Sequence, residues 1–249
     1  MNKSRALQKP DQQKSPAKNA SNKQIMLVPH QLWQQPPYTI LMPELKKTKP
    51  EIEIKLRIKD ISEILRKLKS LSTQSQRRVQ EQNTLYDTPQ SHLRRRKMLL
   101  RLRIETPANR SAPTTGNRAR VILTVKAPPQ ASPKKSQPSQ YKERAEREQL
   151  LPQSSRQYAK ALTSLGFRPA FRYDKFRTTF HLPNLHLDLD ETPAGIYLEL
   201  EGTPKAIDRA AKALGFTKKA YLRATYGDLY AAACRRLGTK PKNMLFTAK

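Results

Sequence analysis

The chain has 249 residues, with 49 lysines and arginines against 20 aspartates and glutamates, a formal net charge of +29 and a single cysteine. One cysteine excludes a framework of internal disulfides, and no apolar run approaches the roughly 20 residues that a membrane-spanning helix needs. The N-terminus also lacks the apolar core of a secretory signal. We therefore expect a cytoplasmic protein, without a membrane span, whose substrate or partner is anionic.

Residues 1–49 are rich in Lys, Gln, Ser, Asn and Pro, and contain nine basic residues against Asp11 and Glu44. High positive charge with little aliphatic periodicity predicts a disordered basic N-terminal arm. We favour a solvated tail over a contact with nucleic acid through this arm. The remainder, residues 50–249, is expected to form one domain.

From residue 51 onward, short segments alternate between apolar and charged side chains, which is typical of β-strands with two unlike faces. Eight such strands in one region predict a closed barrel or a sandwich. The predicted strands are 51–59, 78–87, 98–105, 119–127, 140–149, 171–181, 185–191 and 196–201.

Four other segments show apolar residues at helical spacing. Pro204 suits a first helical turn, and Gly166 and Gly215 stand where helix C-caps are expected. Two stretches, 106–118 and 128–140, carry Pro, Ser and scattered basic residues and predict long loops. The predicted helices are 60–71, 154–165, 204–214 and 219–236.

The first predicted strand, EIEIKLRI at 51–58, taken alone indicates an ordinary strand with its charged face in water. The same alternation recurs in later strands, and their opposite faces are mostly Leu, Ile, Val or Phe. If helices cover that apolar face of a closed barrel, the charged face lines the lumen. The aligned sets are Arg101, Arg103 and Glu105; Thr124 and Lys126; Arg144, Glu146 and Glu148; Lys175, Arg177 and Thr179; His186, Asp188 and Asp190; and Tyr197, Glu199 and Glu201.

A lumen with charges of both signs suits a divalent metal bound to a polyphosphate. The acidic clusters lie in the first and last strands, and the basic clusters lie mostly between them. Mg²⁺ and Mn²⁺ prefer hard oxygen ligands such as carboxylates. Lysine and arginine neutralise phosphate oxygens, arginine in bidentate fashion.

The run EIEIK matches the ExExK signature of the CYTH superfamily, also called triphosphate tunnel metalloenzymes, which includes class IV adenylate cyclases, thiamine triphosphatases and inorganic triphosphatases. ExExK alone arises readily in charged proteins, but an ordered series of further motifs supports it. The chain resembles this superfamily over roughly residues 50–246. The supporting motifs are QNTLYDT at 82–88, LRLR at 100–103, LTVKAP at 123–128, RAERE at 144–148, KFR at 175–177, LDETPAGIYLELEG at 189–202, TYGDLY at 225–230 and NMLF at 243–246.

The resemblance implies an α+β fold in which an eight-stranded antiparallel β-barrel forms a triphosphate tunnel with helices packed outside. It implies catalytic roles for Glu51, Glu53 and Lys55. The implied metal ligands are Glu51, Glu53, Asp190, Glu199 and Glu201. The implied triphosphate-binding residues are Lys55, Arg101, Arg103, Lys126, Arg144, Lys175 and Arg177.

Some positions depart from the family pattern or remain open. Ala127 stands where the family motif has glycine, and Leu85 stands where an aromatic residue is common. Neither change removes a charged group, so they bear on the identity of the substrate more than on binding. Glu146 and Glu148 belong either to the metal shell or to an ion-pair network.

The expected activity is Mg²⁺- or Mn²⁺-dependent hydrolysis of a triphosphate such as ATP, thiamine triphosphate or inorganic triphosphate. A class IV adenylate cyclase that makes cyclic AMP from ATP is the alternative, because a shared fold does not determine which nucleophile is positioned. A further alternative is a non-catalytic module that binds polyphosphate or nucleic acid. Four glutamates in the cavity argue against that module, since a pure anion binder gains nothing from them.

Overall fold

The computed structural model describes residues 50–71, 77–108, 119–129, 139–152 and 154–246. The predicted arm at 1–49 lies outside the described residues, as does most of each predicted long loop. Within these ranges, no helix is long and apolar enough to cross a membrane.

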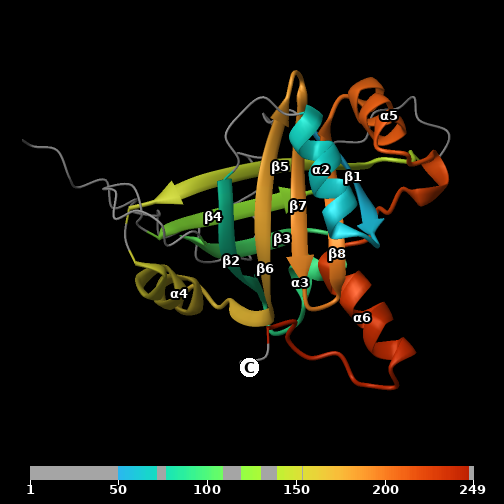
Figure 1. The fold of residues 1–249 in the computed structure, drawn as a ribbon. Helices are drawn as coiled ribbons and strands as arrows, with labels where there is room; N and C mark the ends of the chain where they lie inside the picture. Colours follow the sequence, from blue (N-terminus) through green and yellow to red (C-terminus); the bar gives the residue numbers. More distant parts are fainter. Residues whose placement is uncertain (1–49, 72–76, 109–118, 130–138, 153, 247–249) are drawn as a thin grey trace, which may run out of the picture. The chain divides into compact units, whose positions relative to one another are not determined.

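Eight antiparallel strands close into a barrel in the order β1-β5-β4-β3-β2-β6-β7-β8 (Figure 1). Every predicted strand is present, with each end within three residues of its predicted position. A closed barrel turns alternate residues inward along every strand, which explains the clear period of two. The strands are β1 (Pro50–Ile58), β2 (Arg77–Asp87), β3 (Leu99–Pro107), β4 (Arg120–Ala127), β5 (Lys142–Leu151), β6 (Arg168–Leu182), β7 (Leu185–Thr192) and β8 (Gly195–Gly202).

Strand β1 closes the barrel by pairing with a different strand on each side. Residues 50–53 pair with β5, and residues 53–58 pair with β8. The charged residues of β1 therefore lie beside both β5, which carries charges of both signs, and the acidic strand β8.

Two helices, α2 (Ile61–Leu71) and α5 (Pro204–Ala213), cover the outer face of β1 and the β6–β8 sheet (Figure 1). Ile54 and Leu56 point outward from β1 and are 0% exposed beneath them. Burial of a side chain of this size stabilises the fold by about 1.5–3 kcal/mol. This apolar layer holds the outer face of β1, so its charged face points into the barrel.

On another side of the barrel, α4 (Ser155–Ser164) and the short α3 (His92–Arg95) pack against β3 and β4. The sequence pattern did not predict α3, because four residues are too few to show helical periodicity. Its first turn is bound by the buried carboxylate of Asp87, whose oxygens accept hydrogen bonds from the backbone N–H groups of Leu93 and Arg94 at 2.9 and 3.0 Å.

The predicted helix ends at Pro204, Gly166 and Gly215 are confirmed. Thr203 caps α5 by accepting a hydrogen bond from the backbone of Ala206, and Pro204 follows at the first helical position. Gly166 and Gly215 follow α4 and α5 with φ of +90° and +92°, a conformation that glycine adopts without a Cβ penalty.

The last predicted helix, 219–236, begins later than expected. A short 3₁₀ turn at Lys218–Ala220 comes first, and α6 spans Tyr226–Arg236. Between them, Leu222 exchanges two 2.9 Å backbone hydrogen bonds with Lys55. Because Leu222 forms this isolated antiparallel bridge with β1, the helix begins only after it.

Tyr221 therefore lies outside α6, although Tyr221, Tyr226 and Tyr230 stand at near-helical spacing in the sequence. Its hydroxyl instead donates a hydrogen bond to Asp208 on α5 at 2.9 Å. Tyr226 is the first residue of α6, directly after Thr225, whose side chain caps the helix.

Candidate functional site

Charged side chains from all eight strands point inward and line a cavity of about 1350 Å³. Glu51, Glu53 and Lys55 are among them, so the charged face of EIEIK is the inner face of the barrel. All the other predicted site residues also line this cavity, apart from Asp190. Asp190 is 0% exposed and is enclosed by neighbouring side chains.

Lys55 lies between two carboxylates at the pairing of β1 and β8. Its Nζ is 2.9 Å from Glu53 Oε1 and 2.9 Å from Glu199 Oε1. Burial acts to lower the pKa of Lys55, but the charges of Glu199 and Glu53 outweigh it and raise that pKa. Lys55 is therefore a fixed cation at neutral pH.

Lys126 takes the corresponding place between Glu51 and Glu146, where β4 and β5 meet the start of β1. Its Nζ lies 2.7 Å from Glu51 Oε2 and 2.8 Å from Glu146 Oε2. Burial and a hydrogen bond with Glu146 raise the pKa of Glu51 to about 9. Burial acts to raise the pKa of Glu146 as well, but the hydrogen bond with Glu51 and the charge of Lys126 lower it to about 2. The two carboxyls thus share one proton at neutral pH.

Glu53 and Glu201 stand directly opposite each other in the β1–β8 pair. Glu53 is 5% exposed, whereas Glu201 lies at an exposed margin of the cavity. The ammonium group of Lys142, on β5, also binds Glu53. Lys142 was not predicted, because it precedes the alternating RAERE run that marked its strand.

Arg177 on β6 forms ion pairs with several carboxylates of the lumen. Its guanidinium reaches Asp188, Asp190 and Glu199, each at 2.6 Å. Asp190 also accepts hydrogen bonds from Lys175 and from the Tyr226 hydroxyl. Three neighbouring strands, β6, β7 and β8, are tied together by this one side chain.

Arg101 and Arg103 project from β3 into the same cavity. Arg101 Nη2 lies 3.0 Å from Glu148 Oε1 and donates to Thr124 at 3.1 Å. Arg103 Nε donates to Asn83 at 3.2 Å and lies 3.4 Å from Glu81 Oε2. Glu148 therefore belongs to the ion-pair network.

Arg144 also lines the cavity, but its guanidinium reaches the backbone carbonyl of Lys97 instead of a carboxylate. Among the described residues, no ion pair of Arg144 is found at 4.0 Å or closer. Its guanidinium thus differs from the interior cations, which are each held by at least one carboxylate.

The sequence pattern also missed Glu81 and Tyr226. Glu81 is 0% exposed in the barrel interior, but the inner face of β2 mixes it with Val79, Asn83 and Leu85, so no charged run marks this strand. Tyr226 falls within the predicted helix 219–236, where no charged run marks it, and its hydroxyl group contacts Asp190 in the interior.

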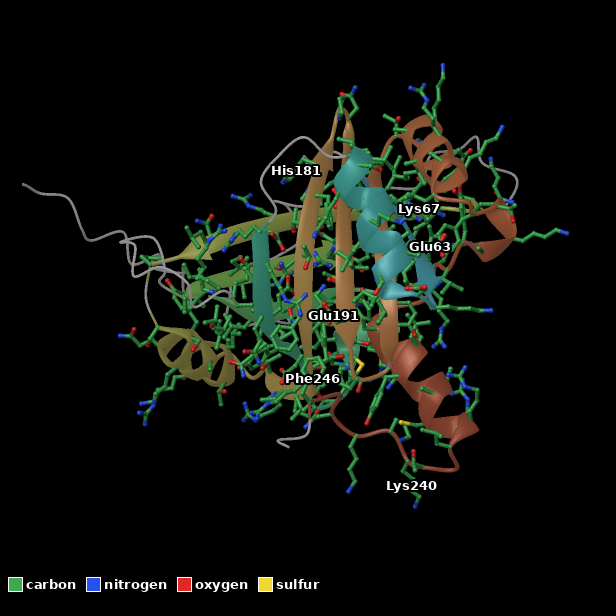
Figure 2. All side chains as sticks on the ribbon, viewed as in Figure 1. Glu63, Lys67, His181, Glu191, Lys240 and Phe246 are labelled. Atoms are coloured by element: carbon green, nitrogen blue, oxygen red, sulfur yellow. The ribbon has the colours of Figure 1, made fainter. Side chains whose placement is uncertain are left out.

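Two histidines lie near the tip of the β6–β7 hairpin, where Figure 2 labels His181. His181 Nδ1 and His186 Nδ1 are 3.2 Å apart, and His186 Nε2 is 3.2 Å from Asp188 Oδ1. The hydrogen bond with Asp188 raises the pKa of His186.

The CYTH-domain model matches residues 49–225. The chain belongs to the CYTH family. The match covers all eight strands of the barrel and confirms the resemblance drawn from EIEIK and the later motifs.

Solved structures with the same fold include a Pyrococcus horikoshii protein, at 22% identity and a TM-score of 0.58, with 72% of this chain and 97% of that chain covered. A proposed adenylate cyclase from Vibrio parahaemolyticus has 18% identity and a TM-score of 0.58, with 74% and 98% covered. A second Pyrococcus horikoshii protein has 22% identity and a TM-score of 0.53, with 71% and 96% covered. Among curated proteins, none matches the chain.

CYTH enzymes depend on divalent metals, and the donor set of this barrel has the right chemistry. Glu51, Glu53 and Glu201 supply carboxylate oxygens, which Mg²⁺ and Mn²⁺ prefer. In the described part of the chain, however, no three His, Cys, Asp or Glu side chains gather closely enough to hold an ion. Lys55 and Lys126 each lie between two carboxylates.

Proposed function

We propose that this CYTH protein is a metal-dependent hydrolase of an organic or inorganic triphosphate bound inside the barrel. The observation that carries the proposal is the arrangement of Glu53, Lys55 and Glu199, in which an ammonium is fixed at 2.9 Å between two carboxylates. Anion-binding and cation-binding groups therefore alternate in one cavity, as a metal triphosphate requires.

The basic side chains of the lumen are the proposed triphosphate ligands. Arg177 and Lys175 are already oriented by Asp190, at 2.6 and 2.9 Å, so little side-chain entropy is lost when a phosphate binds them. Positioning and charge stabilisation supply most of the catalysis in phosphoryl transfer. The full proposed set is Lys55, Arg101, Arg103, Lys126, Arg144, Lys175 and Arg177.

The proposed ligands of Mg²⁺ or Mn²⁺ are Glu51, Glu53, Asp190, Glu199 and Glu201. When bound, the ion would offset negative charge on the phosphate oxygens and lower the pKa of a water. Glu53 and Glu199 would exchange a contact with Lys55 for the ion, which turns the ammonium of Lys55 toward the phosphate. Glu51 must lose the proton that it shares with Glu146 before both of its oxygens can act as ligands.

A second candidate is an adenylate cyclase, in which a ribose hydroxyl replaces water as the nucleophile. It is favoured by the aromatic side chains at the α6 end of the cavity, which provide faces for a flat ring. The rings of Phe171 and Tyr173 are 5.8 Å apart, and those of Phe171 and Tyr230 are 6.3 Å apart.

Incubation of the purified protein with ATP, thiamine triphosphate or inorganic triphosphate, together with Mg²⁺ or Mn²⁺, tests these activities. Phosphate, pyrophosphate and cyclic AMP are followed in each reaction. Phosphate without cyclic nucleotide is expected for the hydrolase, whereas cyclic AMP with pyrophosphate would establish the cyclase. Tight triphosphate binding without any product would replace both with a binding module.

A further inference from the structure

Among the described residues, Glu81 on β2 contains the one buried side-chain oxygen that accepts no hydrogen bond. The residue is 0% exposed and contributes to the wall of the barrel cavity. Buried polar atoms nearly always form hydrogen bonds, so a carboxylate oxygen without one at this position needs a physical explanation.

Glu81 lies among three of the proposed phosphate ligands and is shared by all of them. Its Oε2 is 3.3 Å from Lys175 Nζ and 3.4 Å from Arg103 Nε, and its Oε1 is 3.5 Å from Arg177 Nε. Lys175 and Arg177 approach Asp190 more closely, at 2.9 and 2.6 Å. Asp190 therefore makes the closer contacts with both side chains, whereas Glu81 is a more distant counter-ion that they share.

The carboxylate of Glu81 is charged at neutral pH. Burial acts to raise its pKa, but the positive charges of Lys175, Arg103 and Arg177 hold that pKa well below its usual range. A negative charge in this position neutralises the three cations, as the oxygens of a bound phosphate would.

We propose that Glu81 is a positioning residue that stands in for a substrate phosphate and competes with it for Arg103, Lys175 and Arg177. The inference rests on the proposed function. In the absence of substrate, Glu81 reduces repulsion among the three cations. When a triphosphate binds, Lys175 and Arg177 keep their contacts with Asp190 and exchange those with Glu81 for phosphate oxygens, so Glu81 limits how tightly substrate and product are held.

Glu105 provides a matched control. It stands directly opposite Glu81 in the β2–β3 pair and is also buried, at 7% exposed. Apart from Arg103, it contacts Arg77 and Arg120, whose side chains are 49% and 44% exposed. Glu105→Gln removes the same charge from the barrel, but leaves Lys175 and Arg177 with all of their partners.

The test is the dissociation constant for inorganic triphosphate, measured by titration calorimetry in EDTA for the wild type, Glu81→Gln and Glu105→Gln. We expect Glu81→Gln to bind about tenfold more tightly, because one competing charge is removed from a partly screened site. Glu105→Gln should stay within about twofold of the wild type, since most of its partners are solvated. With Mg²⁺ present, KM and kcat of Glu81→Gln should both fall, because product leaves more slowly.

Unchanged or weaker binding by Glu81→Gln, or equal tightening in both variants, would overturn the inference. Structural damage does not tighten binding, so a gain in affinity is specific to the proposed competition. If Glu81→Gln does not fold, as judged by circular dichroism, Glu81→Asp replaces it. Its shorter carboxylate retreats from the three cations and should give a smaller tightening, and a loss of affinity would refute the idea. Failure of the wild type to bind triphosphate would instead reject the proposed function.

Discussion

Lys55 on β1 and Glu199 on β8 stand directly opposite each other, with Nζ 2.9 Å from Oε1. This contact depends on the register of the two strands, since a slip of one residue would turn Lys55 toward the apolar layer outside the barrel. Ile54 and Leu56, both 0% exposed under the outer helices, oppose such a slip. The apolar face of β1 therefore fixes the geometry of its charged face.

Glu53→Gln should reduce triphosphate turnover by about 100-fold, the upper range for loss of one metal-site partner. The amide is a weaker metal ligand, and it leaves Lys55 and Lys142 without a shared counter-charge. Phosphate release measured over a range of Mg²⁺ concentrations checks this, with partial recovery expected at high Mg²⁺.

The matched control for that substitution is Glu63→Gln. Glu63 lies on α2, paired with Lys67 at 2.7 Å outside the barrel, and its side chain is 51% exposed (Figure 2). Its turnover should equal that of the wild type. Full activity in Glu53→Gln would show that the metal site is wrongly assigned.

Arg177→Lys should lower the free energy of unfolding by about 1.5–3 kcal/mol, the range for losing a hydrogen bond to a charged group. One ammonium group cannot reproduce the fork that reaches Asp188, Asp190 and Glu199. Urea unfolding and the KM for triphosphate measure the two consequences, and KM should rise. Arg66→Lys, at an exposed position of α2, is the control and should change neither quantity. An Arg177→Lys protein with wild-type stability would show that the guanidinium contacts with the three carboxylates do not contribute to the free energy of unfolding.

The shared proton of Glu51 predicts a pH dependence of stability. The pKa of Glu51 rises from 4.5 to about 9 on folding, so the folded state binds more protons between these values. Its contribution is therefore complete below pH 4.5 and is lost as the pH rises to about 9, at up to about 1.4 kcal/mol per pH unit. Glu51→Gln should flatten the stability profile between pH 6 and 9 in EDTA. A slope equal to that of the wild type would assign the proton elsewhere.

Tyr226→Phe should lower the free energy of unfolding by about 1–3 kcal/mol, because it removes a buried hydrogen bond to a carboxylate. The burial of Tyr226 and the charge of Asp190 raise the pKa of the tyrosine, so its hydroxyl stays protonated and donates. The paired control is Tyr230→Phe, whose hydroxyl donates at an exposed position to the Asn243 carbonyl at 3.2 Å. Chemical denaturation of both variants measures the difference, and equal losses would contradict the prediction.

The barrel could be predicted from sequence because its strands have two unlike faces. A period of two between charged and apolar residues is visible without any knowledge of which strands pair. EIEIK and YLELEG show it most clearly, and their residues Glu53 and Glu201 meet in the structure. The metal and phosphate roles came from the family resemblance and stay predictions.

What could not be predicted depends on contacts between distant segments. Leu222 leaves the helical pattern because it hydrogen-bonds Lys55, and no local signal reports such a contact. Glu81 lies on a strand whose inner face is mixed, so its position became visible only from the closed barrel. Lys142 was missed because it precedes the alternating RAERE run, and its partner Glu53 lies on another strand.

The family match and the folded domain end at different residues. The family match stops at residue 225, yet the next residue, Tyr226, donates to Asp190 inside the barrel. Further along, Met244 exchanges two 2.9 Å backbone hydrogen bonds with Arg172 and Asp174 on β6. A truncation at the boundary of the match would remove α6, which Thr225 caps. It would also remove Met244, the hydrogen-bond partner of the Arg172 and Asp174 backbone on β6. Residues 226–246 are thus part of the folded domain, and expression of the domain must include them.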